Sequence, residues 1–316
     1  MAAEFPYHPL KTGKDLDVLL DEIGDAQVVM LGEASHGTSE YYTWRTAISR
    51  RLIEEKGFTF IAVEGDWPDC FEVNRYVKGY NKNYKSVHDV LKTFDRWPSW
   101  MWANWEVAAL AEWLHEYNQN MPNHQSKAGF YGLDVYSLWE SLEQVMHYLE
   151  NHDGEAAKAA EKAFNCFEPF NKDPQLYAQA TALVPKSCED EVVEMLQKIS
   201  EKKQVVADEP EADFNTTQNA LVAVNAEKYY RAMIRGGSSS WNVRDHHMME
   251  TLNRLMEFHG PGAKAIVWEH NTHIGDAVYT DMRGDDMVNI GQLAREAYGR
   301  NNVRLVGFGS YQGTVI

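Results

Sequence analysis

A histidine and two glutamates stand directly behind apolar segments of this chain. Glu33 and His36 follow one such segment, and Glu64 follows the next. An imidazole has an ordinary pKa of about 6.5, so a neutral His36 can take a proton from water near neutral pH. A carboxylate such as Glu33 or Glu64 can orient that imidazole or stabilise its protonated form. These residue types predict base-catalysed hydrolysis with His36 as the general base.

Further polar residues can complete such a site. Arg45 lies on the helix expected after His36 and can supply positive charge to an oxyanion. His270 and His273 follow another apolar segment and offer a second acid or a donor to the leaving group. The remaining candidates are expected to contact the substrate; they are Asp66, Trp67, Trp102 and Arg244.

The same residues admit other interpretations. Glu33 and His36 have a spacing that suits a helix cap, and His270 alone can be a hydrogen-bonded structural histidine. Glu64 and Asp66 can be an acidic pair at a helix N-terminus. A metal site is a stronger alternative, because glutamates and histidines are ligands for zinc and for harder divalent ions. The residues that would form it are Glu33, His36, Glu64, His270 and His273. Sequence spacing does not separate a metal cluster from an acid–base pair.

Five apolar runs are expected to position these side chains. They are Ala26–Leu31, Thr59–Val63, Ala128–Leu133, Ala263–Trp268 and Val303–Phe308. None alternates cleanly between apolar and polar residues, which is typical of strands covered on both faces. Amphipathic segments such as Tyr41–Lys56 separate them, so the pattern predicts an α/β fold with a mainly parallel, doubly wound sheet. Ligands bind at the carboxyl ends of such strands, where the candidate residues stand.

About 130 residues between the third and fourth runs contain no convincing strand but have helical spacing. We therefore predict an α/β core made of residues 1–135 and 259–316, which carries the site. Residues 136–258 are predicted to form a large helical insertion or subdomain packed on that core.

Composition limits the classes of partner. The net charge of −17 disfavours nucleic acid and anionic membrane surfaces, and no run approaches a membrane span. The start of the chain lacks the pattern of a secretory signal. Three scattered cysteines, Cys70, Cys166 and Cys188, form no CxxC pair, so no disulfide framework or zinc site is indicated. These features predict a cytoplasmic protein with a small-molecule substrate, and they leave its oligomeric state open.

Tryptophan is abundant, and four of its ten residues lie between Trp97 and Trp105. Aromatic side chains at this density fill a core or line a ligand cleft. A third hypothesis is therefore a non-catalytic protein that binds a flat apolar or haem-like ligand through these aromatics and a histidine.

Several ordered motifs resemble the erythromycin esterase family, some members of which carry a succinoglycan biosynthesis label. The motifs are Gly32-Glu33-Ala34-Ser35-His36-Gly37, Glu64-Gly65-Asp66-Trp67, Ser240-Trp241-Asn242-Val243-Arg244-Asp245 and Trp268-Glu269-His270-Asn271-Thr272-His273. The similarity runs in order from about Asp15 to the end of the sequence.

This resemblance implies hydrolysis of a macrolide lactone, a reaction that inactivates the antibiotic, without metal or other cofactor. It implies that His36 is the general base for a water. It also implies that the cleft around His36 is lined by Glu33, Arg45, Glu64, His270 and His273. The resemblance favours acid–base hydrolysis over the metal site, and it leaves the substrate of this chain open.

Overall fold

A five-stranded parallel sheet forms the centre of the computed structural model, which describes residues 7–81, 83–122, 127–150, 154–183, 187–201 and 210–314. The strands are β1 (Val28–Leu31), β2 (Phe60–Asp66), β3 (Gly129–Asp134), β4 (Ala265–Trp268) and β5 (Val303–Val306). Their order across the sheet is β3-β2-β4-β1-β5, and every neighbouring pair is parallel. All five predicted strands and the doubly wound α/β fold are confirmed.

Alternate residues of each strand enter two separate cores, one on each face of the sheet. Val29, Ile61 and Ile266 face one core, whereas Met30 and Val267 face the other. Because both faces are covered, each residue of the four strands other than the edge strand β5 is buried. This double burial explains why the strands are apolar runs and not alternating patterns.

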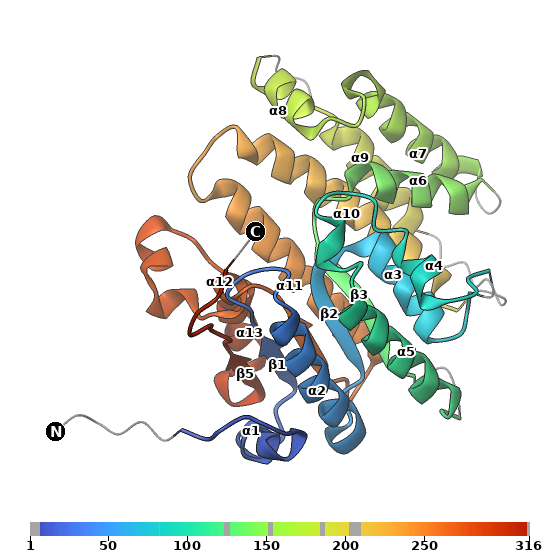
Figure 1. The fold of residues 1–316 in the computed structure, drawn as a ribbon. Coiled ribbons are helices and arrows are strands. Elements are labelled where there is room, and N and C mark those ends of the chain that lie inside the picture. The colour runs from blue at the N-terminus through green and yellow to red at the C-terminus, as the bar shows by residue number, and fades with distance from the viewer. Residues whose placement is uncertain are drawn as a thin grey trace.

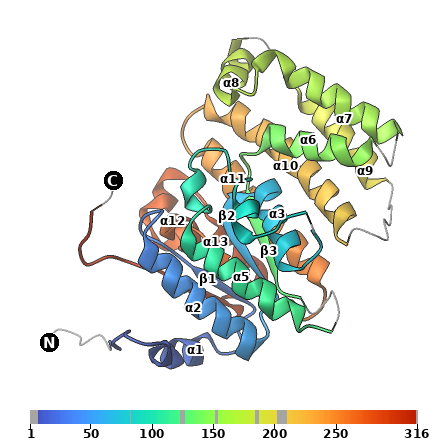
Figure 2. The same ribbon diagram turned by 45° about the vertical axis from the view of Figure 1, so that its right-hand side comes forward.

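Helices cover both faces of the sheet. The first face is covered by α1 (Asp17–Ile23), α2 (Ser39–Lys56), α4 (Val87–Leu91) and α5 (Trp105–Gln119), with part of α3 (Trp67–Val77). The second face is covered by α11 (Ser239–His259) and α13 (Ile290–Tyr298). Figures 1 and 2 show α2 and α5 running side by side in front of the strands.

A further helical layer lies beyond the β3 edge of the sheet, at the top of Figure 1. It contains α6 (Leu138–Leu149), α7 (Gly154–Phe167), α8 (Pro174–Leu183), α9 (Glu189–Ser200) and α10 (Ala212–Met233). These helices share a core of their own, in which Ala160, Ala163, Ala220 and Ala223 allow close helix packing. The next helix, α11, lies within the predicted insertion 136–258 but packs on the sheet. The division of the chain at these residues stays a prediction.

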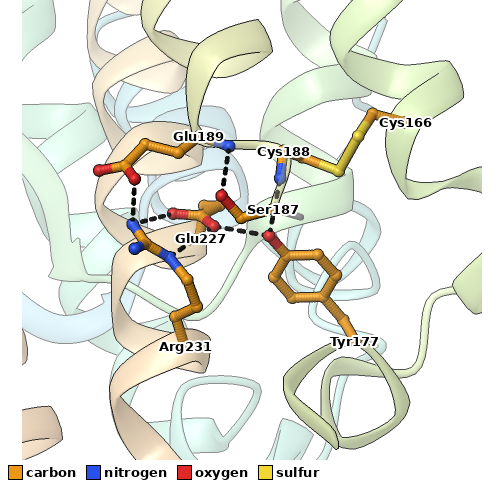
Figure 3. The surroundings of a disulfide bond; sticks show 7 residues. All are labelled: Cys166, Tyr177, Ser187, Cys188, Glu189, Glu227 and Arg231. Atoms are coloured by element: carbon orange, nitrogen blue, oxygen red, sulfur yellow. Dashed lines mark hydrogen bonds and ion pairs between the residues drawn. A yellow bond between two sulfur atoms is a disulfide. The ribbon is translucent and has the colours of Figure 1, made fainter. Parts of the chain in front are cut away.

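A disulfide joins Cys166, at the end of α7, to Cys188, which caps the N-terminus of α9 (Figure 3). The interpretation of the cysteines as an unpaired set is therefore wrong for two of them, while Cys70 is free and buried. The two partners lie 22 residues apart, and only the packing of α7 against α9 brings them together. The cysteine content thus no longer supports a reducing compartment, and the cytoplasmic location stays a prediction.

Within the described residues, no helix is long and apolar enough to cross a membrane.

Candidate active site

The loop after β1 presents His36 at the carboxyl edge of the sheet. Gly37 follows with a φ of 80°, a left-handed conformation that favours glycine. A Cβ at Gly37 would also lie 2.8 Å from the ring of Trp100. The chain therefore turns sharply beneath Trp100 and leaves the His36 side chain 34% exposed.

Glu33, His36 and Arg45 form one hydrogen-bonded group, which we call the His36 cluster. His36 Nδ1 lies 2.7 Å from Glu33 Oε1, and Arg45 Nη2 donates to Glu33 Oε2 over 2.8 Å. A carboxylate only accepts hydrogen bonds, so Nδ1 carries the imidazole proton and Nε2 keeps its lone pair. The hydrogen bond that His36 donates to Glu33 raises the pKa of His36 above its ordinary value, although burial opposes the rise. The cluster thus holds an imidazole in the tautomer of a general base.

Arg45 is fully buried and stands behind Glu33. Its guanidinium lies 4.8 Å from the ring centre of Tyr42 and 4.7 Å from that of Trp268. The sequence suggested that Arg45 supplies charge to an oxyanion, but its side chain does not reach the cleft surface. In this position it fixes the carboxylate of Glu33, which in turn fixes the imidazole.

A second hydrogen-bonded group lies deeper and joins four elements; we call it the Arg244 cluster. Arg244, on α11, donates to both oxygens of Asp134 at the end of β3, and its Nη2 donates to Glu64 Oε1 over 2.6 Å. Its Nη1 lies 3.0 Å from His273 Nε2. His273 Nδ1 lies 3.0 Å from Asp245, whose carboxylate also accepts the backbone N–H of Ile290.

Arg244 determines the charge state of this group. Burial alone would raise the pKa values of Glu64 and Asp134, but the guanidinium beside them outweighs burial. It holds the pKa of Glu64 below its usual range and lowers that of Asp134 to about 2. Both carboxyls are therefore ionised at neutral pH, and each forms an ion pair with the same arginine.

Both nitrogens of His273 are hydrogen-bonded, and its ring stacks on Trp241 at a centroid distance of 4.4 Å. Because a guanidinium only donates, His273 Nε2 accepts from Arg244 and Nδ1–H donates to Asp245. His273 is 2% exposed. It therefore positions Arg244 and has no free lone pair to offer a substrate.

His270 connects the two clusters. Its backbone N–H donates to Glu64 Oε2 over 2.7 Å, and its ring lies 5.3 Å from the ring of His36. It caps α12 (Asn271–Ile274), because its Nδ1 accepts the backbone N–H of Thr272. Since that nitrogen is an acceptor, the proton of a neutral His270 lies on Nε2. The interpretation of His270 as a hydrogen-bonded structural histidine is thus correct for Nδ1. Its Nε2–H is a potential hydrogen-bond donor beside His36.

A cleft of about 250 Å³ opens beside these clusters. Of the predicted site residues, five line it: His36, Glu64, Asp66, Trp102 and Arg244. Trp102 is almost fully buried, and its Nε1 donates to the backbone oxygen of Glu64. Asp66 forms an ion pair with Arg96. Glu33, His270 and His273 do not line the cleft but bond residues that do, and Arg45 in turn bonds Glu33.

Trp67 lies apart from the site. It is fully buried, stacks on Phe71 and Tyr131, and donates from Nε1 to Asn215. Trp67 is the first residue of α3 and its side chain enters the core of the second face, so the structure does not bring it to the cleft.

The capping interpretation does not describe the end of β1. The N-cap of α2 is Thr38, so Glu33 and His36 bond to each other and do not cap that helix. Asp66 occupies the N-cap position of α3 without a capping hydrogen bond, so the interpretation as an acidic residue at a helix N-terminus fits Asp66, whereas Glu64 lies before it in β2 and pairs with Arg244.

Four acidic residues near the site were not among the predicted site residues, and two of them, Asp69 and Asp134, line the cleft. Asp134 and Asp245 each bond a member of the Arg244 cluster. Glu269 is fully buried, and neither of its carboxyl oxygens has a hydrogen-bond partner within the described residues. Burial, together with Glu64 and Asp245, raises the pKa of Glu269 well above its usual range. A carboxylate at a strand end was the available signal for Asp134, whereas nothing in the spacing pointed to Asp245.

Among the residues that the structure describes, no group of three or more His, Cys, Asp or Glu side chains is arranged to hold a metal ion. The groupings that do form are the two ion-paired clusters above.

Comparison with known proteins agrees with the motifs at the strand ends. The family model described as Erythromycin esterase matches residues 53–316. The chain belongs to the erythromycin esterase family. Residues 53–316 include Glu64, Arg244, His270 and His273, whereas the His36 cluster lies before the matched region.

Relatives in this family are distant. The chain is 30% identical over 162 residues to the protein named erythromycin esterase type II from Escherichia coli, an alignment that covers 50% of this chain and 36% of the relative. It is 22% identical over 282 residues to a putative hydrolase, YbfO, from Bacillus subtilis, covering 83% and 59% of the two chains. The chain thus spans less than two thirds of the length of either relative.

Solved structures share the fold. The crystal structure of a protein titled as a succinoglycan biosynthesis protein superposes with a TM-score of 0.76 at 24% identity, covering 95% of this chain and 71% of that one. A mutant erythromycin esterase in its open conformation gives a TM-score of 0.70 at 15% identity, with coverage of 94% and 73%. At these identities the likeness establishes the architecture.

Proposed function

We propose that the protein is a hydrolase that cleaves a carboxylic ester or lactone with a water activated by His36. The observation that carries the proposal is the His36 cluster. Glu33 holds Nδ1–H, so the basic Nε2 of a partly exposed imidazole is directed to the cleft. Members of the erythromycin esterase family supply the reaction class, and the name of one relative suggests a macrolide lactone as substrate.

In this mechanism His36 Nε2 takes a proton from water as the water attacks the carbonyl carbon. The imidazolium that forms is stabilised by Glu33, whose other oxygen is held by Arg45. The attack places negative charge on the carbonyl oxygen, and Arg244 is the cation of the two clusters that lines the cleft. Collapse of the tetrahedral intermediate expels an alkoxide, which takes the proton back from the His36 imidazolium, while His270 Nε2–H can donate a hydrogen bond to the leaving oxygen.

The two imidazoles have complementary protonation. His36 presents a lone pair at Nε2, and the neutral His270 presents a proton at Nε2, with the rings 5.3 Å apart. A base and an acid side by side suit a reaction in which a proton is removed from water and returned to an alcohol.

Mass spectrometry of a panel of macrolides and simple esters, incubated with the protein in H₂¹⁸O, tests the proposal. We expect one water to be added, with ¹⁸O in the new carboxylate. His36→Asn should abolish the product. The matched control is His147→Asn, which changes an exposed histidine on α6 and should leave the product unchanged. Unchanged turnover in His36→Asn would exclude this mechanism.

A further inference from the structure

One wall of the cleft carries two neighbouring carboxyls that the proposed hydrolysis does not use. Asp66 and Asp69 both line it, one at the end of β2 and the other in the first turn of α3. We call this pair the acidic wall. It lies in the same cleft as His36, so a substrate held at His36 can extend to it.

The acidic wall has an unsatisfied oxygen. Arg96 donates to Oδ2 of Asp66, but Oδ1 is buried and has no hydrogen-bond partner within the described residues. The side chain of Asp66 is 7% exposed. A buried charged oxygen without a donor is costly, so its persistence points to a partner that arrives with a ligand.

In the free protein, burial and neighbouring negative charge both disfavour the ionised forms of Asp66 and Asp69. Burial raises the pKa of Asp66 to about 6 even though Arg96 opposes the rise. Burial, with further contributions from Asp66, Asp95 and Glu140, raises the pKa of Asp69 to about 8 against the opposing effect of Arg96. Asp66, Asp95 and Glu140 thus add negative charge near Asp69, and Arg96 opposes their effect. A positive charge placed at the wall would relieve the repulsion.

The surfaces around the wall are aromatic and apolar. Phe94, Met101 and Trp102 line the same cleft, and all three are largely buried. Carboxylates beside aromatic rings suit an alkylammonium group, because its charge faces the carboxylates and its methyl groups contact the rings. A small hydrated metal ion gains nothing from the apolar surfaces.

We propose that Asp66 and Asp69 bind an alkylammonium group of the ligand, so that the cleft selects ammonium-bearing esters. The selectivity for esters rests on the proposed function, whereas the binding of the ammonium group does not. Because Asp69 must lose its proton to act as a carboxylate, binding of the cation releases protons near neutral pH and tightens between pH 6 and pH 9.

Two isosteric probes test the binding. Choline and 3,3-dimethyl-1-butanol have the same shape and differ by one positive charge. Titration followed by tryptophan fluorescence should show that the wild-type protein binds choline about tenfold more tightly than the neutral alcohol. Asp69→Asn should remove most of this preference. Glu116→Gln makes the same charge change at an exposed position of α5 and should keep it.

Calorimetry in two buffers of different ionisation enthalpy should detect the released proton at pH 7. Equal affinity for the two probes, or an unchanged preference in Asp69→Asn, would overturn the proposal. Displacement of choline by Ca²⁺ at equal concentration, dependent on Asp69, would also overturn it, since the wall would then be a metal site.

Turnover separates this inference from the proposed function. The corresponding acetate esters, acetylcholine and 3,3-dimethylbutyl acetate, should be hydrolysed with a kcat/KM ratio of about ten in favour of the cation, and Asp69→Asn should lower that ratio. If neither ester is hydrolysed but choline binding depends on Asp69, the ammonium site is upheld while the ester hydrolysis fails. If both are hydrolysed equally and Asp69→Asn leaves the ratio unchanged, the ammonium site fails while the hydrolysis is upheld.

Discussion

Two clusters of the same residue types flank the cleft, and they differ in how many nitrogens of their imidazole are hydrogen-bonded. In the His36 cluster, Glu33 and Arg45 hold one nitrogen of a ring that is 34% exposed. In the Arg244 cluster, Arg244 and Asp245 are hydrogen-bonded to the two nitrogens of His273, which is 2% exposed. The combination of histidine, carboxylate and arginine therefore does not by itself define a catalytic base. A free lone pair at an accessible nitrogen makes the difference.

The clusters also differ in how far their members lie apart in the chain. Glu33 and Arg45 are 12 residues apart, whereas Arg244 bonds Glu64 across 180 residues. The first cluster forms from one loop and the helix that follows it. The second forms only when β2, β3, α11 and α12 have packed together. We therefore expect the first to govern the reaction and the second to govern both stability and the shape of the cleft.

The largest expected effect is on catalysis, in His36→Asn. Loss of the general base should lower kcat/KM by about 10²- to 10⁴-fold. His36 is partly exposed and outside the cores, so the free energy of unfolding should fall by only about 1 kcal/mol, because buried Glu33 loses the imidazole N–H. Kinetics on the best ester and chemical denaturation measure the two quantities. A large loss of stability would contradict the division of roles between the clusters.

The largest expected effect on stability is in Arg244→Met. Removing this cation leaves Glu64 and Asp134 buried without their shared partner, which should cost about 3–5 kcal/mol. Denaturant titration at pH 7 measures it. The matched control is Arg50→Met, because Arg50 also stacks on an aromatic ring but lies away from both clusters. A cost below about 1 kcal/mol would show that the Arg244 cluster does not stabilise the fold.

A smaller effect is expected in His273→Asn. Asp245 then loses the imidazole N–H, and unfolding should become easier by about 1–3 kcal/mol. Catalysis should also fall through misplacement of Arg244, but the pH at which the rate rises should stay where it is in the wild type. A shift of that pH would mean that His273 itself exchanges the catalytic proton. The distinction between a catalytic His36 and a positioning His273 would then be wrong.

The smallest expected effect is a change of pH profile in Glu33→Gln. The rate should rise with pH as His36 loses its proton, with the midpoint above 6.5 in the wild type because Glu33 raises the pKa of His36. Without that carboxylate, burial dominates and lowers the pKa of His36, so the midpoint should move to lower pH. Profiles of kcat/KM between pH 5 and 9 measure it.

Glu54→Gln, at an exposed position of α2, provides the control for this profile. A midpoint that is the same in Glu33→Gln and in the wild type would mean that another group, and not His36, limits the rate.

The sequence by itself determined the sheet and one cluster of the site. Strands covered on both faces must be apolar throughout, so five such runs were visible, and parallel strands must place their following residues at one edge. The His36 cluster was visible for a related reason, since Glu33, His36 and Arg45 are near neighbours in the chain.

Only the tertiary structure decided which of these residues face a ligand. Arg45 and His273 turned out to be buried, Trp67 entered a core, and Asp69 joined Asp66 at the cleft. The pairing of Cys166 with Cys188 likewise needed the packing of α7 on α9. The physical reason is the same in each case. Exposure and hydrogen-bond partners depend on contacts between residues far apart in the chain, and spacing along the sequence carries no measure of them.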